Sequence, residues 1–378
     1  MLLPQITAWL RETDDASLAE LWQRADQTRQ QTVGGEVHLR GLIELSNHCV
    51  RLCTYCGLRA GNDKLTRYRM SAEEVLECAH QAVGFGYGTV VLQSGEDLGI
   101  QAEWMADLVR RIKAETSLAV TLSLGEREDH ELALWREAGA DRYLLRFETS
   151  NRALYDRIHP PRPDRHSDRL AMLQTLRRIG YEVGSGVMIG IPGQTYEDLA
   201  RDIDLFRTLD LDMIGVGPYL AHPDTPLGNA GQDEPVGWDE RSAAPPEARD
   251  DTDGGTSLRS SHPTLDDDQV PGTELMTYKV IALSRLVCPK ANIPSTTALA
   301  TLNTANGREL GLVRGANVIM PNLTPPQYRI HYEIYPNKAC IRETGDACHR
   351  CVETRIRSLG RTTGNGRGDS MNYQARCS

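Results

Sequence analysis

The chain has 378 residues, of which 40% are hydrophobic and 25% are charged, as in an ordinary globular protein. This length suits one barrel of about 250 residues with additions, or two domains. The formal net charge of −10 argues against nucleic-acid binding as the main function, because nucleic-acid-binding surfaces are usually basic.

The N-terminus and the cysteine content bear on where the protein works. No apolar run approaches the roughly 18 residues that span a membrane, so we expect no membrane association. Residues 1–15 lack a basic region ahead of an apolar one, which predicts a short helix and not a secretory signal. We therefore expect a cytoplasmic protein, in which nine cysteines favour metal or redox chemistry over structural disulfides.

Short apolar runs alternate with amphipathic helical stretches between residues 37 and 335. Apolar residues on consecutive positions predict parallel strands that are buried on both faces. The runs are 41–45, 89–93, 119–124, 142–146, 186–191, 213–216, 293–297 and 317–320. Eight strand–helix units in a row predict an α/β fold, a (β/α)8 TIM barrel, preceded by a helical segment over residues 1–36. A doubly wound open sheet is the alternative, because strand count alone does not establish closure.

Two of the helix starts carry capping signals. Ser71 and Glu74 form a capping box, in which the serine hydroxyl accepts a hydrogen bond from the first turn and the glutamate reaches back. Thr195 and Asp198 resemble the same box with aspartate in place of glutamate. Apolar residues follow each box at helical spacing, so we expect a helix after each.

Two segments depart from the alternation. Residues 228–272 are rich in Asp, Pro, Gly, Ser and Glu, and they predict a mobile acidic insertion because they offer too little apolar surface to offset the entropy of ordering. A C-terminal extension, residues 336–378, contains a second group of cysteines and ends, from about Thr362, in a tail that we expect to be flexible. The triplet Arg367-Gly368-Asp369 in this tail matches an adhesion motif, and we interpret the match as chance.

Cys49, Cys53 and Cys56 form a C-x3-C-x2-C array after the first predicted strand, at the barrel mouth where βα loops build active sites. One interpretation is structural zinc, which normally takes four ligands, with His48 as the fourth. The other is a 4Fe–4S cluster held by three thiolates, which leaves one iron open to a substrate or cofactor. Tyr55, between the last two cysteines, would shield such a cluster or contact a purine.

This loop, in its C-x3-C-x-Tyr-C form and its place after the first strand, resembles that of the radical S-adenosylmethionine (SAM) superfamily. The resemblance implies that the open iron binds SAM and that one-electron reduction cleaves SAM to methionine and a 5′-deoxyadenosyl radical. Further stretches, among them VVLQSGED, MIGIPGQTYEDL and NIPSTTAL, resemble the HydE family of [FeFe]-hydrogenase maturases over about residues 30–360, outside the insertion. That resemblance implies a radical SAM enzyme of H-cluster assembly that acts on a small organometallic or amino-acid-like substrate, a cysteine-bound iron carbonyl–cyanide complex.

The resemblance also implies roles for individual residues. The 4Fe–4S cluster would be held by Cys49, Cys53 and Cys56. Contacts to SAM and the cofactor site would come from Tyr55, Ser94, Glu148, Arg169, Gly190, Met320 and Tyr335. Substrate binding would fall to Thr121, Thr296 and Thr297, and catalytic roles would fall to Arg146 and Tyr332.

Three of these assignments have alternatives. Glu148 and Arg146 would form an internal ion pair if the glutamate had no cationic ligand. Arg162 or Arg165, in the same loop, is the alternative to Arg169. The glycines around Gly190 let backbone approach a ribose or adenine closely, but a plain strand-to-helix turn would look similar.

Cys340, Cys348 and Cys351 form a second array, C-x7-C-x2-C, which resembles a motif found in part of the HydE family. It implies a second cluster, 2Fe–2S or 4Fe–4S, that relays electrons. Zinc is the alternative, and His349 is a candidate fourth ligand. The remaining Cys78 and Cys288 are expected to be buried thiols on helices.

Other functions stay open on the sequence alone. One is another radical SAM barrel enzyme, such as methylornithine synthase or a biotin-synthase-like protein, although the latter would need further cysteines on the strands and no predicted strand carries one. An electron-transfer iron–sulfur protein is the alternative of a different class, but such proteins usually close each cluster with four ligands. The HydE resemblance implies HydG and HydF as partner maturases and a reduced electron donor, and we expect a monomer.

Overall fold

The computed structural model describes residues 1–162, 167–229 and 268–377. Its centre is a seven-stranded parallel sheet with the strand order β7-β5-β4-β3-β2-β1-β9, beside a separate pair of β6 and β8. The strands are β1 (His38–Ser46), β2 (Thr89–Ser94), β3 (Ala119–Ser123), β4 (Arg142–Leu144), β5 (Glu182–Ser185), β6 (Met188–Ile189), β7 (Met213–Ile214), β8 (Gly217–Pro218) and β9 (Val318–Ile319). Every residue of β1 after His38 is buried, as expected for a parallel strand covered on both faces.

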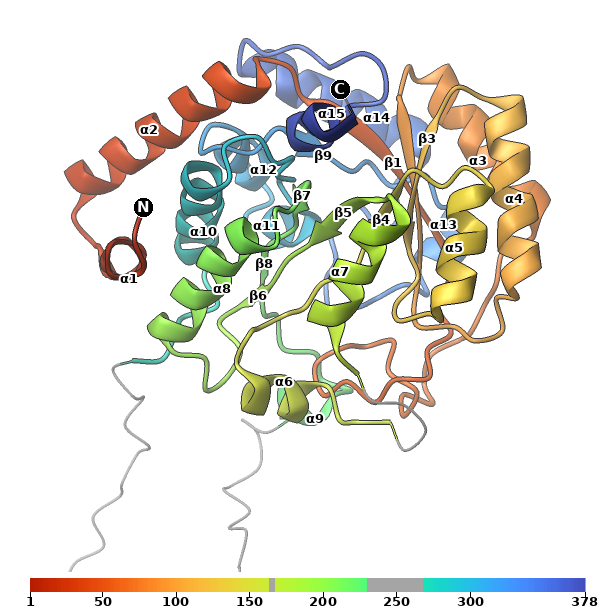
Figure 1. Cartoon of the computed structure of the whole chain (residues 1–378), viewed down its shortest axis with the longest axis horizontal. Helices are drawn as coiled ribbons and strands as arrows, with labels where there is room; N and C mark the ends of the chain where they lie inside the picture. Colours follow the sequence, from red (N-terminus) through yellow and green to blue (C-terminus); the bar gives the residue numbers. More distant parts are fainter. Residues whose placement is uncertain (163–166, 230–267, 378) are drawn as a thin grey trace, which may run out of the picture.

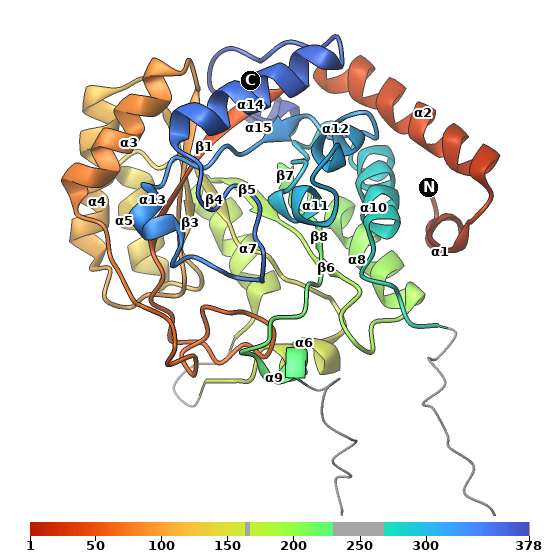
Figure 2. The same cartoon turned by 180° about the vertical axis from the view of Figure 1, so that it is seen from behind.

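The sheet curls into a barrel (Figure 1, Figure 2). Residues 292–294, which are not part of a strand, close the barrel in the space between β7 and β9. Met213 of β7 forms a parallel bridge with Asn292, and Val318 of β9 forms one with Pro294. Backbone hydrogen bonds accompany both bridges. Residues 292–294 therefore take the place of an eighth strand, and the predicted (β/α)8 class is confirmed.

Helices cover the outside of the barrel, as the strand–helix alternation predicts (Figure 1). The helices described between residues 72 and 329 are α3 (Ala72–Gly84), α4 (Ala102–Glu115), α5 (Asp129–Glu137), α6 (Arg152–Ile158), α7 (Arg169–Ile179), α8 (Tyr196–Thr208), α9 (Pro226–Asn229), α10 (Glu274–Val287), α11 (Thr297–Leu302), α12 (Gly307–Leu312) and α13 (Pro326–Arg329). Of these, α6 and α9 lie together at one end of the barrel (Figure 1, Figure 2). Both predicted capping boxes are present. The Ser71 hydroxyl accepts from the Glu74 amide at 3.2 Å, and the Thr195 hydroxyl accepts from the Asp198 amide at 3.1 Å.

The prediction of a strand at 186–191 is wrong in its position. The fifth strand of the sheet is β5, which ends at Ser185, while Met188–Ile189 form β6 and pair with β8. At Gly186, a Cβ would lie 1.7 Å from the carbonyl oxygen of Gly215, so only glycine fits where the chain turns out of the sheet. The run 186–191 is more apolar than β5, and apolar character alone therefore points to the wrong segment.

Two N-terminal helices, α1 (Leu3–Arg11) and α2 (Asp15–Val33), pack against α8 and α10 on the outside of the barrel. The Asp14 carboxylate accepts a hydrogen bond from the Ser17 amide at 2.8 Å and caps the start of α2. Lys279 of α10 donates through its ammonium to the carbonyl of Leu10 at 2.9 Å, which ties the end of α1 to the barrel.

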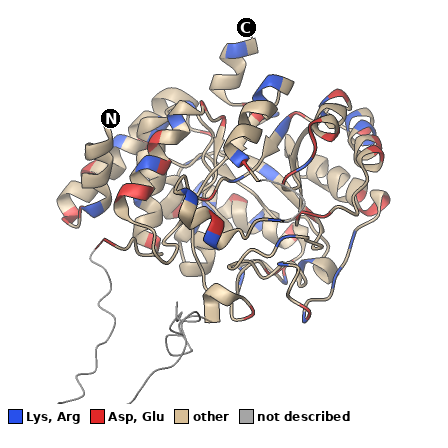
Figure 3. Cartoon of the chain, turned by 60° about the horizontal axis from the view of Figure 1, so that its bottom comes forward, with Lys and Arg blue, Asp and Glu red and all other residues tan. Residues whose placement is uncertain are grey.

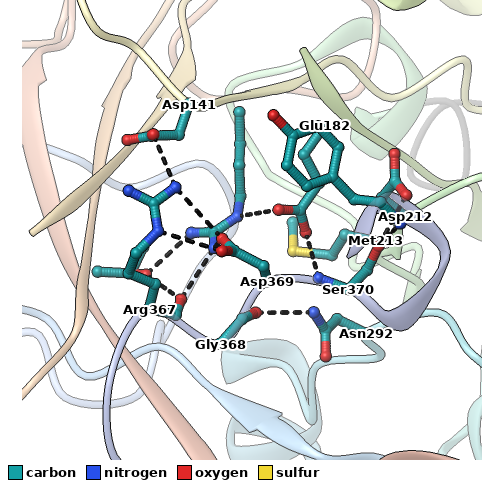
Figure 4. Close-up of polar contacts among 12 residues, drawn as sticks. Asp141, Glu182, Asp212, Met213, Asn292, Arg367, Gly368, Asp369 and Ser370 are labelled. Carbon is teal, nitrogen blue, oxygen red and sulfur yellow. Dashed lines mark hydrogen bonds and ion pairs between the residues drawn. The ribbon is translucent and has the colours of Figure 1, made fainter. Parts of the chain in front are cut away.

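The C-terminal tail follows α14 (Gly345–Ser358), crosses the N-terminal end of the barrel and ends in α15 (Met371–Cys377) (Figure 1). Figure 4 shows the polar contacts of Arg367, Gly368, Asp369 and Ser370. Asp369 forms an ion pair with Arg142 at the start of β4. The Ser370 amide donates to the Glu182 carboxylate at 3.0 Å. The tail was predicted to be flexible from its composition, and these contacts correct that prediction.

Two arginines inside the barrel explain why this polar tail is ordered. Arg40 of β1 and Arg142 of β4 are both buried. Arg40 donates to the carbonyl of Gly368 at 3.0 Å, and Arg142 donates to that of Arg367 at 2.8 Å. A buried guanidinium needs acceptors, and the tail supplies them. The Arg367-Gly368-Asp369 triplet thus has a structural role within the chain.

We expect Asp369→Asn to lower the free energy of unfolding of the apoprotein by about 2 kcal/mol, because the buried Arg142 loses one of its two carboxylate partners. The matched control is Asp107→Asn, since the Asp107 side chain is 70% exposed and pairs only on the surface with Arg110. For the control we expect less than about 0.5 kcal/mol. Urea unfolding followed by circular dichroism measures both, and equal effects would contradict the structural role of the tail.

The predicted mobile insertion, residues 228–272, lies outside the described residues except at its two ends. None of the helices in the described ranges combines the length and the apolar character needed to cross a bilayer. Basic and acidic residues are interspersed over the described helices (Figure 3). This mixture of signs differs from the one-sided basic face of a nucleic-acid-binding protein.

Candidate active site

A cavity of about 280 Å³ lies inside the barrel at the carboxyl ends of the strands. Eight residues to which the sequence assigns roles line it, namely Tyr55, Cys56, Arg146, Glu148, Thr296, Thr297, Met320 and Tyr335. They come from the cysteine loop, from the ends of several strands and from residues 333–338, the C-terminal segment over the mouth of the cavity. The carboxyl end of the strands is where barrel enzymes bind their substrates, and this volume suits a small molecule.

The three-cysteine loop follows β1 at the same end of the barrel. Burial raises the pKa of Cys49, Cys53 and Cys56, and for Cys56 the pKa reaches about 12. After burial, the negative charges of Cys56 and Cys49 raise the pKa of Cys53 further. Among the described residues, no three His, Cys, Asp or Glu side chains are arranged around a common metal position. Binding of metal would stabilise the thiolates that burial disfavours.

Arg67 holds the cysteine loop in shape. Its guanidinium donates to the carbonyls of Leu58 at 2.9 Å and Arg59 at 2.8 Å. At Gly57, a Cβ would lie 2.3 Å from the carbonyl oxygen of Glu333, so the C-terminal segment packs directly on the loop. The loop and the segment over the cavity mouth therefore form one packed unit.

Arg146 and Glu148 lie just beyond β4 and form an ion pair, with 3.0 Å between Nη2 and Oε2. The alternative of an internal ion pair is thus present in the structure. Glu148 has a φ of 64°, and its amide donates to the carbonyl of Gly186 at 3.1 Å while its carbonyl accepts from the Met188 amide at 3.1 Å. The Tyr55 hydroxyl lies 3.4 Å from the other carboxylate oxygen. A left-handed non-glycine residue held in this way is a feature that clusters at active sites.

Arg169 is the first residue of α7. Its side chain does not line the cavity and is hydrogen-bonded to other residues of the chain. Its Nε donates to Glu126 at 2.9 Å, and its Nη1 donates to a backbone carbonyl at 2.7 Å. The alternative Arg162 lies 3.4 Å from Glu96, and Arg165 lies outside the described residues. For Arg169 to pair with a ligand carboxylate, it would have to exchange Glu126 for that ligand.

Arg51 is a residue for which the sequence predicts no role. Its side chain is only 2% exposed, and none of its three guanidinium nitrogens has a hydrogen-bond partner among the described residues. The nearest acceptors are Glu96 and Glu126, at 4.0 and 3.9 Å. A buried guanidinium without hydrogen bonds is costly, so this position would gain from a further anionic ligand. Its place between two cysteines is the only signal for it in the sequence.

Ser94, Thr121 and Tyr332 do not line the cavity. The Ser94 hydroxyl donates to the neighbouring carbonyl of Gly95 at 2.5 Å. The Thr121 hydroxyl is buried without a hydrogen-bond partner in the described part of the chain. The Tyr332 hydroxyl accepts from Gln93 at 3.3 Å, and Gln93 does line the cavity. Tyr332 therefore reaches the cavity only through a neighbour.

Gly190 also lies off the cavity wall, and packing explains why it is a glycine. Its φ is 79°, and a Cβ there would lie 2.3 Å from the Cα of Gly272. The position therefore requires glycine whether or not a cofactor approaches it.

A second ion pair on the cavity wall, Lys338 with Glu44, is not apparent from the sequence. Both side chains are buried, and the Lys338 ammonium also donates to the carbonyl of Tyr332 at 3.0 Å. On the same wall, the hydroxyls of Tyr219 and Thr296 are buried without a hydrogen-bond partner among the described residues. The lining thus combines two cations, two carboxylates and free hydroxyls. A zwitterionic guest could satisfy all of these groups.

In the second cysteine set, Cys348 and Cys351 are residues of α14, and Cys340 lies in the segment before it. Cys340 and Cys348 form a hydrogen bond with each other, which lowers the pKa of Cys340 and raises that of Cys348. Two cations lie against the sulfurs: Arg308 Nη2 is 3.6 Å from Cys340 Sγ, and Arg355 Nε is 3.4 Å from Cys351 Sγ. Such an electropositive setting favours thiolates.

His349, the candidate fourth ligand of a zinc site, contacts two aromatic side chains. Its ring stacks on that of Phe85 with 4.4 Å between centroids, and its Nδ1 lies 3.0 Å from the Tyr87 hydroxyl. The side chain is therefore engaged in packing against α3 and the turn after it.

Asp202 of α8 supports the loop that follows Glu148, since its Oδ1 accepts from the Ser150 amide at 2.6 Å and from the Ser150 hydroxyl at 2.5 Å. Burial raises the pKa of Asp202 from 3.8 to about 7. The folded state therefore binds more protons than the unfolded state between about pH 4 and 7. The protonated Asp202 side chain stabilises the folded state at low pH, and this stabilisation is lost as the pH rises through that window.

Asp202→Asn removes this titration. We expect the free energy of unfolding of the variant apoprotein, relative to the natural chain, to increase by about 2–3 kcal/mol between pH 5 and pH 8. Urea titrations at the two pH values measure it. A difference between the two proteins that does not change with pH would contradict the buried, protonated Asp202.

The kinds of side chain in and around the loop suit a 4Fe–4S cluster with SAM bound to it. The loop offers three thiols and the buried guanidinium of Arg51, and the cavity offers hydroxyls that lack partners in the described ranges. Each of these groups would gain from a ligand, because buried polar groups are otherwise hydrogen-bonded.

Comparisons with known proteins agree with this geometry. Residues 43–206 match the model of the radical SAM superfamily. The chain is 43% identical to the [FeFe] hydrogenase maturase subunit HydE of Thermotoga maritima over 348 residues, 92% of this chain and 88% of the relative. It is 24% identical to the 3-methylornithine synthase of Methanosarcina acetivorans over 83% of this chain and 77% of the relative. The crystal structure of methylornithine synthase (PylB) shares the fold, with a TM-score of 0.75 at 23% identity over 96% of this chain and 94% of that one. The chain therefore belongs to the radical SAM superfamily and, within it, to the family of the hydrogenase maturase HydE.

Proposed function

We propose that this radical SAM enzyme reductively cleaves SAM and acts on a small guest in the barrel cavity during assembly of the [FeFe]-hydrogenase active site. The observation that carries this proposal is the 43% identity to HydE over 92% of the chain. The identity to 3-methylornithine synthase is 24%, so the rival activity is the weaker inference.

Cys49, Cys53 and Cys56 are the proposed ligands of the 4Fe–4S cluster. When bound and reduced by one electron, the cluster supplies the cleavage of SAM to methionine and a 5′-deoxyadenosyl radical. Tyr55 and Glu148 orient SAM at the cavity wall, and Arg169 or Arg51 pairs with its carboxylate. A guanidinium suits this role because it donates two parallel hydrogen bonds to a carboxylate.

The cavity wall binds the guest and keeps water out. Arg146 and Lys338 attract a carboxylate, Glu44 attracts an ammonium group, and Thr296 and Thr297 supply hydroxyls. This lining suits an amino-acid-like, zwitterionic substrate, and a cysteine-bound iron carbonyl–cyanide complex has that chemistry. Met320 and Tyr335 complete the wall. The wall confines the radical to the guest, and this protects the protein from attack by the radical.

Cys340, Cys348 and Cys351 are proposed to hold a second cluster, 2Fe–2S or 4Fe–4S, that relays electrons. Arg308 and Arg355 would stabilise its negative charge. The enzyme is proposed to work in the cytoplasm as a monomer, with HydG and HydF as partner maturases and a reduced electron donor.

Maturation of a hydrogenase in a host that lacks its own HydE tests this function. We expect hydrogen evolution when this chain is produced with an [FeFe] hydrogenase, HydF and HydG, and none when Cys53→Ala replaces it. The control Cys78→Ala changes a buried thiol of α3, outside the loop, and should retain activity. Absence of maturation, together with formation of 3-methylornithine by the purified protein, would favour the rival enzyme.

A further inference from the structure

His159 is a buried histidine that contacts both the cysteine loop and the cavity wall. It ends α6, and its Nδ1 lies 3.1 Å from the sulfur of Cys53. Its Nε2 lies 3.0 Å from the hydroxyl of Tyr55, which in turn is 3.4 Å from Glu148. One ring thus connects a proposed cluster ligand with a proposed SAM contact.

The ring of His159 is fixed in place by its surroundings. It stacks on Tyr155 with 4.8 Å between centroids and 17° between planes. The Tyr155 hydroxyl lies 2.9 Å from the Ser167 hydroxyl, and Ser167 donates to Glu126 at 2.6 Å. A ring held by a stack and by two polar contacts has little freedom to rotate away from the sulfur.

The chemistry of the two partners determines which nitrogen carries the proton. A thiolate that ligates metal can only accept a hydrogen bond, so Nδ1 must carry the proton that faces Cys53. Nε2 is then the acceptor, and the Tyr55 hydroxyl donates to it.

We propose that His159 is a positioning residue that donates a hydrogen bond to the Cys53 sulfur and thereby raises the reduction potential of the cluster in this loop. The proposal rests on the proposed function, because it requires a cluster bound through Cys53. A hydrogen bond to a ligand sulfur withdraws negative charge from it. It stabilises the reduced cluster more than the oxidised one, since the reduced cluster has one more electron.

Three variants separate the hydrogen bond from packing. His159→Leu fills similar space without a donor. His159→Asn retains a side-chain amide N–H near the position of Nδ1 and loses the contact with Tyr55. Tyr55→Phe removes the hydroxyl that keeps the proton on Nδ1. All are prepared without oxygen as the full chain, reconstituted with iron and sulfide, and titrated with a one-electron reductant while the reduced cluster is followed by electron paramagnetic resonance (EPR).

At the potential where the natural protein is half reduced, we expect His159→Leu to lower the ratio of reduced to oxidised cluster at least tenfold. For a one-electron couple, this corresponds to about 59 mV. His159→Asn should stay close to the natural protein, and Tyr55→Phe should shift in the direction of the leucine variant by a smaller amount. An unchanged ratio in His159→Leu would overturn the proposal, and so would an equal shift in His159→Asn, because packing would then explain both.

A second measurement needs no variant that might misfold. Pulsed EPR of the reduced natural protein labelled with ¹⁵N-histidine, with no SAM added, should show a nitrogen coupled to the cluster. Its absence would overturn the proposal. The potential is measured without SAM, so a protein that titrates as expected but does not cleave SAM overturns only the proposed function.

Discussion

Cys53→Ala is expected to abolish the cleavage of SAM altogether. Cys53 is the most buried cysteine of the loop, with 7% of its surface exposed, and burial raises its pKa. If the loop holds a cluster through three thiolates, removal of one leaves too few ligands to retain it. Formation of 5′-deoxyadenosine, assayed without oxygen in the presence of a reductant, is expected to fall below detection.

The control for this prediction is Cys78→Ala. Cys78 is also buried, but it lies on α3, and its thiol donates to the carbonyl of Leu323 at 3.4 Å. The substitution removes the same atom from a site that is not near the loop, so the iron content and SAM cleavage should be retained. Equal losses in the two variants would indicate a general effect of thiol removal and would contradict the assignment of Cys53.

Glu148→Gln is expected to weaken the binding of SAM by tenfold to about 150-fold. The side chain keeps its shape but loses the charge that pairs with Arg146 and that would face a cationic ligand. A hydrogen bond to a charged group contributes about 1.5–3 kcal/mol, which converts to this range. The measurement is the dissociation constant of SAM for the reconstituted protein, obtained by equilibrium dialysis.

Glu197→Gln is the matched control, because the Glu197 side chain is 60% exposed and pairs only with Arg201 one turn away on α8. It should bind SAM as the natural protein does. A dissociation constant in Glu148→Gln that equals that of the control would mean that the left-handed Glu148 serves only its internal ion pair.

Much of the fold follows from the sequence because parallel strands of a barrel are apolar on consecutive positions. The strands at 89–93 and 119–124 were predicted nearly to the residue, and both capping boxes are present. The fifth strand was misplaced because β5 is short and begins with a buried glutamate, Glu182, which pairs with Arg142. A charge that is neutralised by a distant residue leaves no local pattern in the sequence.

The site was predictable where it depends on a motif and hidden where it depends on contacts between distant residues. The spacing of the cysteines pointed to the loop, and Arg146, Glu148 and Thr296 do line one cavity. The buried Arg51 and the contact of His159 with Cys53 could not be predicted, because they arise when loops that are distant in the sequence meet. The ordered tail was missed for the same reason, since buried arginines of the barrel bind it.

The central claim is that three thiolates of this loop leave an iron that binds SAM. The most direct test is the EPR spectrum of the reduced, reconstituted protein before and after SAM is added, with 5′-deoxyadenosine measured in the same sample. We predict a spectrum that changes with SAM and formation of 5′-deoxyadenosine, both of which are lost in Cys53→Ala. An unchanged spectrum with intact SAM would contradict the claim and would favour an electron-transfer protein or a zinc site.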